Sequence, residues 1–153
     1  LLFTRQGLPT IDRSVYPSAK GLHKGAYTLW QSGEGNPDVI IIATGSEVDL
    51  GLKAAEEFAN SVNIRVVSMP CWETFDKQTD DYKKEVIPDR GSLKISIEAG
   101  ITNGWEKFIG INGLAIGINH YGSSAPAEDL AHAFGFTADQ ISDKIEKFLE
   151  KLL

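Results

Sequence analysis

Three stretches of the chain carry residue types suited to binding or acid–base chemistry. Thr44-Gly45-Ser46 follows a continuous apolar run, and a small, flexible turn at a helix N-terminus presents backbone N–H groups that bind anions. Glu98 ends a second apolar stretch, where catalytic acids stand in α/β folds. Arg5, flanked by Thr4 and Gln6, is permanently charged and grips a phosphate through two N–H donors.

Each feature also has a structural explanation. The Gly-Ser turn suits a helix cap, Glu98 suits a hydrogen bond that fixes the next loop, and Arg5 suits an exposed surface position. The chain has no Gly-Lys-Ser/Thr ending of a Walker loop, no G-x-G-x-x-G after a strand and no Gly-x-Ser-x-Gly elbow. The motifs alone therefore leave binding and structural roles open.

The remaining reactive side chains are isolated in the sequence. Cys71 is the only cysteine, and His23, His120 and His132 are scattered, none of them at metal-ligand spacing with it. We expect an inert thiol and no metal site. A single cysteine forms no internal disulfide, which fits a reducing cytosolic setting.

Charge and hydropathy exclude several classes of partner. The net charge of −6 argues against a nucleic-acid or anionic-membrane surface, and no apolar run of membrane-spanning length occurs. The first 30 residues nevertheless carry four basic side chains against one acidic one. That local excess favours either a small anion or an ordinary solvated surface.

The run Val39–Ala43 organises the predicted fold, because unbroken apolar residues indicate a strand buried on both faces of a sheet. Residues 26–30 predict another strand. The link over residues 32–37 is too short for a crossover helix, so we expect these two strands to be antiparallel neighbours. Residues 5–24 carry Gly and Pro without period and predict an irregular connection.

The rest of the chain alternates between helix and strand patterns. Ser46 is predicted to cap a helix that leads to a parallel strand over 63–68. Later helices are expected from Trp72 with a break near Thr79, at 105–109, between Pro126 and Gly135, and after a Thr137/Gln140 capping box; further strands are expected at 93–97 and 114–118. The terminal helix carries an apolar stripe of Ile141, Ile145, Phe148, Leu149 and Leu152.

These elements predict a three-layer α/β/α fold around a five-stranded, mostly parallel mixed sheet. We divide the chain into an irregular segment, 1–24, and an α/β domain, 25–153.

Several motifs, taken in order, resemble the C-terminal domain of transketolase from about Leu2 to the chain end. They are Thr4-Arg5-Gln6-Gly7-Leu8-Pro9, Lys24-Gly25-Ala26-Tyr27, Ile42-Ala43-Thr44-Gly45-Ser46-Glu47-Val48, Arg65-Val66-Val67-Ser68-Met69-Pro70-Cys71-Trp72-Glu73 with Phe75-Asp76-Lys77-Gln78, Glu98-Ala99-Gly100, and Ser124-Ala125-Pro126-Ala127.

The resemblance implies a thiamine diphosphate enzyme that transfers a two-carbon ketol unit from a ketose phosphate to an aldose phosphate. It assigns binding of the substrate phosphate to Arg5, in a motif that reads Thr-Arg-Gln here where the family has Ser-Arg-Gln. It also implies a cytoplasmic or plastid homodimer of the pentose phosphate pathway that holds magnesium or calcium.

Two departures restrict what this chain does by itself. It lacks a Gly-Asp-Gly motif followed by an Asn pair, which this cofactor class uses to hold metal and diphosphate, and it is too short for the family's other two domains. We therefore expect a domain fragment that is inactive alone, with no catalytic, cofactor or metal residue of its own. The alternatives are a nucleotide- or metabolite-binding regulatory module and the C-terminal domain of another thiamine diphosphate enzyme.

Overall fold

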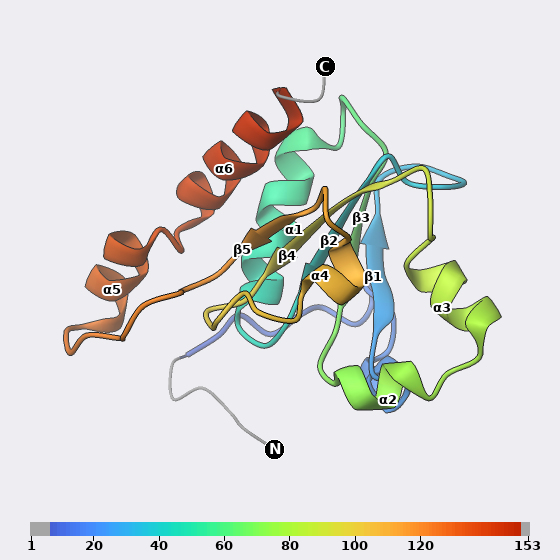
Figure 1. The fold of residues 1–153 in the computed structure, drawn as a ribbon, viewed down its shortest axis with the longest axis horizontal. Coiled ribbons are helices and arrows are strands. Elements are labelled where there is room, and N and C mark those ends of the chain that lie inside the picture. The colour runs from blue at the N-terminus through green and yellow to red at the C-terminus, as the bar shows by residue number, and fades with distance from the viewer. Residues whose placement is uncertain (1–6, 151–153) are drawn as a thin grey trace.

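The computed structural model, which describes residues 7–150, is built on five strands in the spatial order β1-β3-β2-β4-β5 (Figure 1). Their bounds are β1 Tyr27–Gln31, β2 Val39–Ala43, β3 Ile64–Ser68, β4 Leu93–Ile97 and β5 Leu114–Ile116. The four strands β2 to β5 are parallel, and β1 alone runs antiparallel. The predicted five-stranded, mostly parallel sheet is confirmed.

Strand β2 lies at the centre, as its sequence predicted, and all five of its residues are buried. Successive side chains of a strand point to opposite faces. Ile41 accordingly packs in the cluster under one helical layer, whereas Ile40 and Ile42 pack in the cluster under the other. The unbroken apolar run thus follows from helices covering both faces of the sheet.

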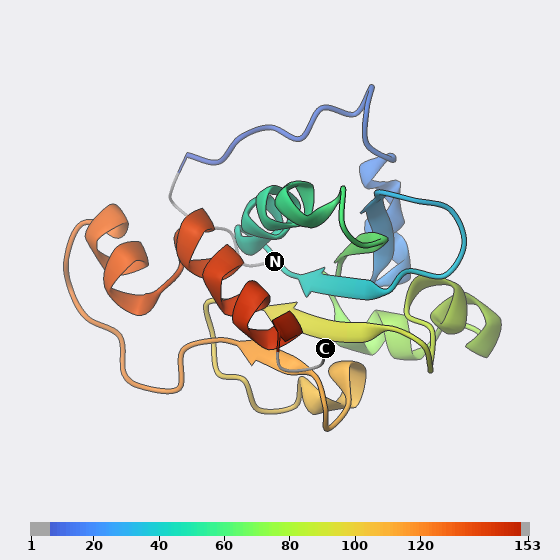
Figure 2. The same cartoon turned by 90° about the horizontal axis from the view of Figure 1, so that it is seen from above.

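Two helical layers enclose the sheet (Figure 2). Helices α1 Glu47–Phe58 and α6 Ala138–Glu150 cover one face, where Leu52 and Ile145 pack with Ile41. Helices α2 Trp72–Asp76, α3 Asp80–Val86 and α4 Glu106–Ile109 cover the other face. Helix α5 Ala127–Phe134 precedes α6. This is the predicted three-layer α/β/α arrangement.

The predicted pairing of β1 with β2 is wrong, because β3 lies between them and Tyr27 stands opposite Ser68. The link over residues 32–37 passes the amino end of β3, where the Asn63 side-chain amide donates to the carbonyl oxygens of Glu34 and Asn36 at 2.9 and 3.2 Å. Adjacent strands are about 4.8 Å apart. A short link therefore spans one intervening strand without a helix.

The segment before β1 is more regular than predicted, since Ala19–Lys24 forms a 3₁₀ helix, η1. Ser18 caps it by accepting from the Lys20 N–H at 3.3 Å. Gly25 ends it with a φ of 81°, and a Cβ there would lie 2.4 Å from the carbonyl oxygen of Cys71. Glycine is needed at this position because the backbone approaches α2 so closely.

Helix termini agree with the predictions to within a residue or two, with two corrections. Pro126 stands at the N-cap of α5 rather than at its first helical position. Only half of the capping box forms. Thr137 Oγ1 accepts from the Gln140 N–H at 3.4 Å, but the Gln140 side-chain oxygen accepts from the Thr137 hydroxyl at 2.9 Å rather than from the Thr137 backbone N–H, and its side-chain nitrogen donates to the His132 carbonyl oxygen. Among residues 7–150, none of the helices combines the length and the hydropathy that a membrane span requires.

Arg65 joins three elements and carries a stability prediction. Its Nε donates to Gln31 Oε1 at 2.7 Å, and its Nη1 donates to the carbonyl oxygens of Glu85 and Val86 at 2.6 and 3.0 Å. Partial burial lowers the pKa of the guanidinium from its usual value, but the group stays charged. Arg65→Met should lower the free energy of unfolding in urea by about 2 kcal/mol, since charge-assisted bonds are lost. Arg65→Lys should recover part of the lost unfolding free energy. An Arg65→Met variant as stable as the parent would disprove the role of Arg65 in joining these elements.

Ser142 in α6 carries the opposite prediction. The residue is 6% exposed, and its buried hydroxyl has no hydrogen-bond partner among the described residues. Ser142→Ala should raise the free energy of unfolding by about 1 kcal/mol or more, because a buried unsatisfied hydroxyl is removed. Asp143→Ala, at the exposed next position, should gain only the helix propensity of alanine, about 0.5 kcal/mol. Equal gains would show that burial of Ser142 carries no cost.

Candidate functional site

A groove of about 890 Å³ lies at the carboxyl edge of the sheet. Its walls come from the turn after β2, the end of β4, helices α1 and α5, and the N-terminal stretch of Gly7, Leu8 and Pro9. Open α/β sheets place their ligands at this edge, where the strand order reverses. Here the reversal falls between β2 and β4, because β3 lies on one side of β2 and β4 on the other.

Glu47 lines the groove at this reversal and connects the start of α1 to the end of β4. One of its oxygens, Oε1, accepts from the Ser46 hydroxyl at 2.6 Å, and the other, Oε2, accepts from the Ala99 N–H at 3.1 Å. A carboxylate at a helix N-terminus is favoured by the helix dipole. Two donors near the turn, the Ser46 hydroxyl and the Ala99 N–H, are thus bound by a side chain of the protein.

The prediction that Ser46 caps α1 is therefore wrong in its contact, although Ser46 does stand at the N-cap position. Its backbone is helical, with φ −64° and ψ −29°, and its side chain makes no cap hydrogen bond. Side-chain capping needs an extended backbone at the cap residue. The hydroxyl donates to Glu47 instead.

Glu98 has the structural role that we weighed against catalysis. Its Oε2 accepts from the indole N–H of Trp105 at 2.8 Å, and Trp105 is 1% exposed. The Glu98 carbonyl oxygen accepts from the Gly100 N–H at 2.7 Å. Glu98 therefore fixes the loop between β4 and α4 and satisfies the one polar atom of a buried tryptophan side chain.

The other reactive side chains do not assemble into a site within residues 7–150. Cys71 Sγ lies 3.4 Å from Glu73 Oε2 and 3.1 Å from Thr74 Oγ1, with no imidazole among these partners. His120 Nδ1 lies 2.9 Å from the carbonyl oxygen of Tyr121. Across the described part of the chain, no group of three His, Cys, Asp or Glu side chains has the geometry to hold a metal ion.

Arg5, the predicted phosphate-binding residue, lies outside the described residues, so its role stays a prediction. Gly7, two positions later in the sequence, lines the groove. The lysine among the groove's described residues, Lys53, pairs with Asp49 at 2.8 Å. An anion in this groove would therefore need a cation from another part of the protein.

Sequence reasoning missed the role of Glu47. The available signal was its position as the first residue after the Gly-Ser turn, where a carboxylate suits a helix N-terminus. Its second partner, Ala99, is 52 positions away and follows only from the fold.

The sheet order, the two helical layers and the groove define a three-layer α/β domain with a concave surface at the carboxyl edge of its sheet. Residues 25–137 match the family model described as the transketolase-like C-terminal domain. The chain belongs to this family.

Relatives and solved structures agree with that assignment. Transketolase of Aquifex aeolicus is 44% identical over 146 residues, which cover 95% of this chain and 21% of the relative, and that of Bacillus subtilis is 39% identical over 152 residues, which cover 99% and 23%. The structure of Pichia stipitis transketolase in complex with sedoheptulose-7-phosphate superposes with a TM-score of 0.82 at 35% identity, over 95% of this chain and 20% of that one. This chain thus spans about a fifth of the length of its curated relatives.

Proposed function

We propose that this chain serves as the C-terminal domain of a transketolase that moves a two-carbon ketol unit from a ketose phosphate to an aldose phosphate. The observation that carries the proposal is similarity to transketolases over nearly the whole chain, at 44% identity for the Aquifex aeolicus relative. The superposition on a transketolase that holds a sugar phosphate supports it.

In this proposal Arg5 binds the phosphate of the substrate. The described side chains of the groove do not supply the cation for this task, because its lysine is paired with Asp49 and Glu47 adds further negative charge. A sugar phosphate needs a strong, geometrically matched cation to offset these carboxylates, and a guanidinium provides two parallel donors. Arg5 precedes the groove-lining Gly7 by two residues.

The described residues do not fit the cofactor that the family implies. They contain no trio of metal ligands, and at the switch point the Ser46 hydroxyl and the Ala99 N–H are bound by the Glu47 carboxylate. We therefore assign thiamine diphosphate and its magnesium or calcium ion to other parts of the full protein. The proposal extends to a homodimer in the pentose phosphate pathway, located in the cytoplasm or a plastid, without a nucleic-acid or membrane partner. The domain itself begins at residue 25, after the segment 1–24.

The two hydrogen bonds that Glu47 accepts count against the alternative of a nucleotide- or metabolite-binding regulatory module. A nucleotide phosphate at the turn would compete with the Glu47 carboxylate for the Ser46 hydroxyl and the Ala99 N–H. Like charges this close repel strongly in a partly buried setting. Another thiamine diphosphate enzyme is disfavoured by the family match.

The proposal is tested on the chain by itself. Isothermal titration calorimetry with thiamine diphosphate and Mg²⁺ should give no heat of binding, and a coupled assay with a ketose phosphate and an aldose phosphate should show no transfer. Both results follow from the missing metal ligands of the described residues. Turnover by the isolated chain would overturn the proposal, because catalysis would then need no other domain.

A further inference from the structure

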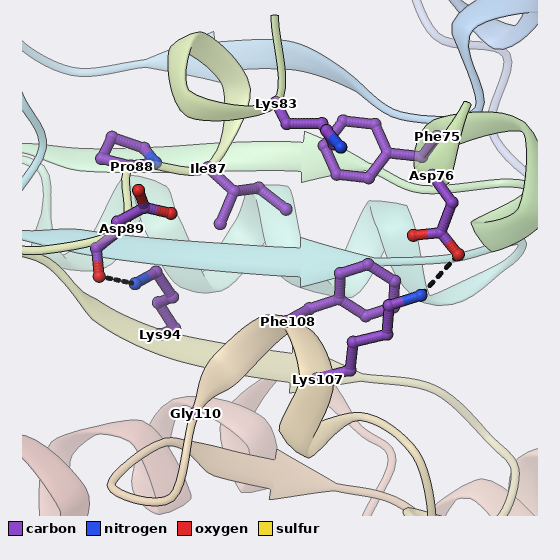
Figure 3. Close-up of a pocket in the computed structure, with 10 residues that line it drawn as sticks. All are labelled: Phe75, Asp76, Lys83, Ile87, Pro88, Asp89, Lys94, Lys107, Phe108 and Gly110. Carbon is purple, nitrogen blue, oxygen red and sulfur yellow. Dashed lines mark hydrogen bonds and ion pairs between the residues drawn. The ribbon is translucent and has the colours of Figure 1, made fainter. Parts of the chain in front are cut away.

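A second pocket, of about 340 Å³, lies away from the carboxyl-edge groove, on the sheet face covered by α2, α3 and α4 (Figure 3). Its residues come from all three helices, from the Ile87–Asp89 connection, from Lys94 in β4 and from Gly110 after α4. The described residues of the carboxyl-edge groove contribute nothing to it. Its volume is in the range of small-molecule sites.

The floor of this pocket is apolar. Phe75 and Ile87 are buried, at 3% and 8% exposure, and the half-buried Phe108 stands beside Phe75 with ring centroids 6.2 Å apart. These three side chains lie between Lys94 at one end and Lys107 with Asp76 at the other (Figure 3). An apolar ligand body placed over them would remove apolar surface from water.

Two of the three lysines that line the pocket have carboxylate partners. Lys107 pairs with Asp76 across α4 and α2, and Lys83 pairs with Asp80 at 2.8 Å. The third, Lys94, donates to the backbone carbonyl oxygen of Asp89 at 3.2 Å and has no ion pair among the described residues.

The surroundings of Lys94 leave its charge incompletely compensated. Burial lowers the pKa of Lys94, and the Asp89 carboxylate offsets only part of that effect. An ammonium has three donors, so two remain after the bond to the Asp89 carbonyl. A carboxylate ligand would restore the compensation.

We propose that this pocket binds a small organic monocarboxylate, with its carboxylate on Lys94 and an aromatic or branched apolar body over Phe75, Ile87 and Phe108. Lys107 pairs with Asp76, Lys83 with Asp80 and Lys84 with Asp89, so among the described residues of the lining Lys94 is left with one positive charge, which a single negative charge balances. A dianion such as inorganic phosphate would carry one charge more than Lys94 balances and would leave the aromatic floor uncovered.

The probe is benzoate, titrated into the ¹⁵N-labelled chain while amide resonances are followed by NMR. Saturable shifts should be confined to residues around the pocket, including Ile87, Lys94, Phe108 and Gly110, with a dissociation constant in the millimolar range, roughly 1 to 10 mM. Benzyl alcohol, which keeps the ring, and inorganic phosphate, which keeps the charge, should each bind at least about tenfold more weakly.

Variants separate the charge of Lys94 from its packing. Lys94→Met keeps the apolar stem and should weaken benzoate binding about tenfold, whereas Lys94→Arg should retain it. Lys53→Met, which removes a lysine of the carboxyl-edge groove, should leave binding unchanged. Equal affinity in Lys94→Met and the parent, or phosphate binding as tight as benzoate, would overturn the proposal. So would the absence of a saturable shift below about 50 mM benzoate.

Discussion

Arg5→Ala in the full-length enzyme is expected to lower kcat/KM for phosphorylated donors roughly 30- to 1,000-fold. This loss corresponds to about 2 to 4 kcal/mol of transition-state binding free energy. The reason is the loss of a charged, bidentate partner for the substrate phosphate. Steady-state kinetics should show most of the effect as a raised KM, because the phosphate is bound in the ground state and the transition state alike.

Two controls separate this role from a general effect of losing an arginine. Arg13→Ala removes an exposed guanidinium from the same N-terminal stretch, where Nη1 donates to the Pro17 carbonyl oxygen at 2.7 Å, and should leave kinetics unchanged. A ketose donor without phosphate should be insensitive to Arg5→Ala. An unaltered kcat/KM for phosphorylated donors would refute the assignment of Arg5.

The second large effect concerns folding: Ile145→Asp should leave the domain unfolded. Ile145 is 0% exposed and packs with α1 and the sheet in the larger core cluster. The change removes a buried isoleucine, which costs about 2 to 5 kcal/mol, and places a carboxyl group in an apolar site without a partner, which costs several more. Together these costs approach or exceed the whole stability of a typical domain, about 5 to 15 kcal/mol.

Far-UV circular dichroism and thermal unfolding measure this directly. The matched control is Glu146→Asp, which introduces the same side chain at the next position of α6, where the residue is exposed. It should melt within a few degrees of the parent, as surface substitutions usually shift stability by less than about 0.5 kcal/mol. If the Ile145→Asp variant unfolded cooperatively at the parent's melting temperature, packing of α6 through Ile145 would not be needed for the stability of the core.

Much of the fold was predictable because its elements are specified locally. The apolar run of β2 and the helical stripe of α6 both depend on residues close in the sequence, and Ile141 and Ile145 are buried as predicted. The neighbour of β1 was not predictable in this way. It depends on contacts of Asn63 with a loop some 27 to 29 positions earlier, and link length alone does not reveal them.

In the candidate site, too, contacts between residues close in the sequence were predictable and long-range contacts were not. The loop-fixing alternative for Glu98 is confirmed, and it was within reach of sequence reasoning because its partner, Trp105, lies only seven positions later. The hydrogen bond between the Glu47 carboxylate and the Ala99 N–H was missed, since it requires the end of β4 to lie beside the start of α1. Arg5 was predicted from family resemblance, and it stays a prediction because it lies outside residues 7–150.

The central claim is that this chain is the C-terminal domain of a ketol-transferring enzyme, and domain replacement tests it most directly. The C-terminal segment of the Bacillus subtilis transketolase, 39% identical to this chain, would be exchanged for the present chain and two-carbon transfer measured. We predict an active chimaera whose activity toward phosphorylated donors falls on Arg5→Ala. A folded chimaera that binds thiamine diphosphate but transfers nothing would contradict the claim.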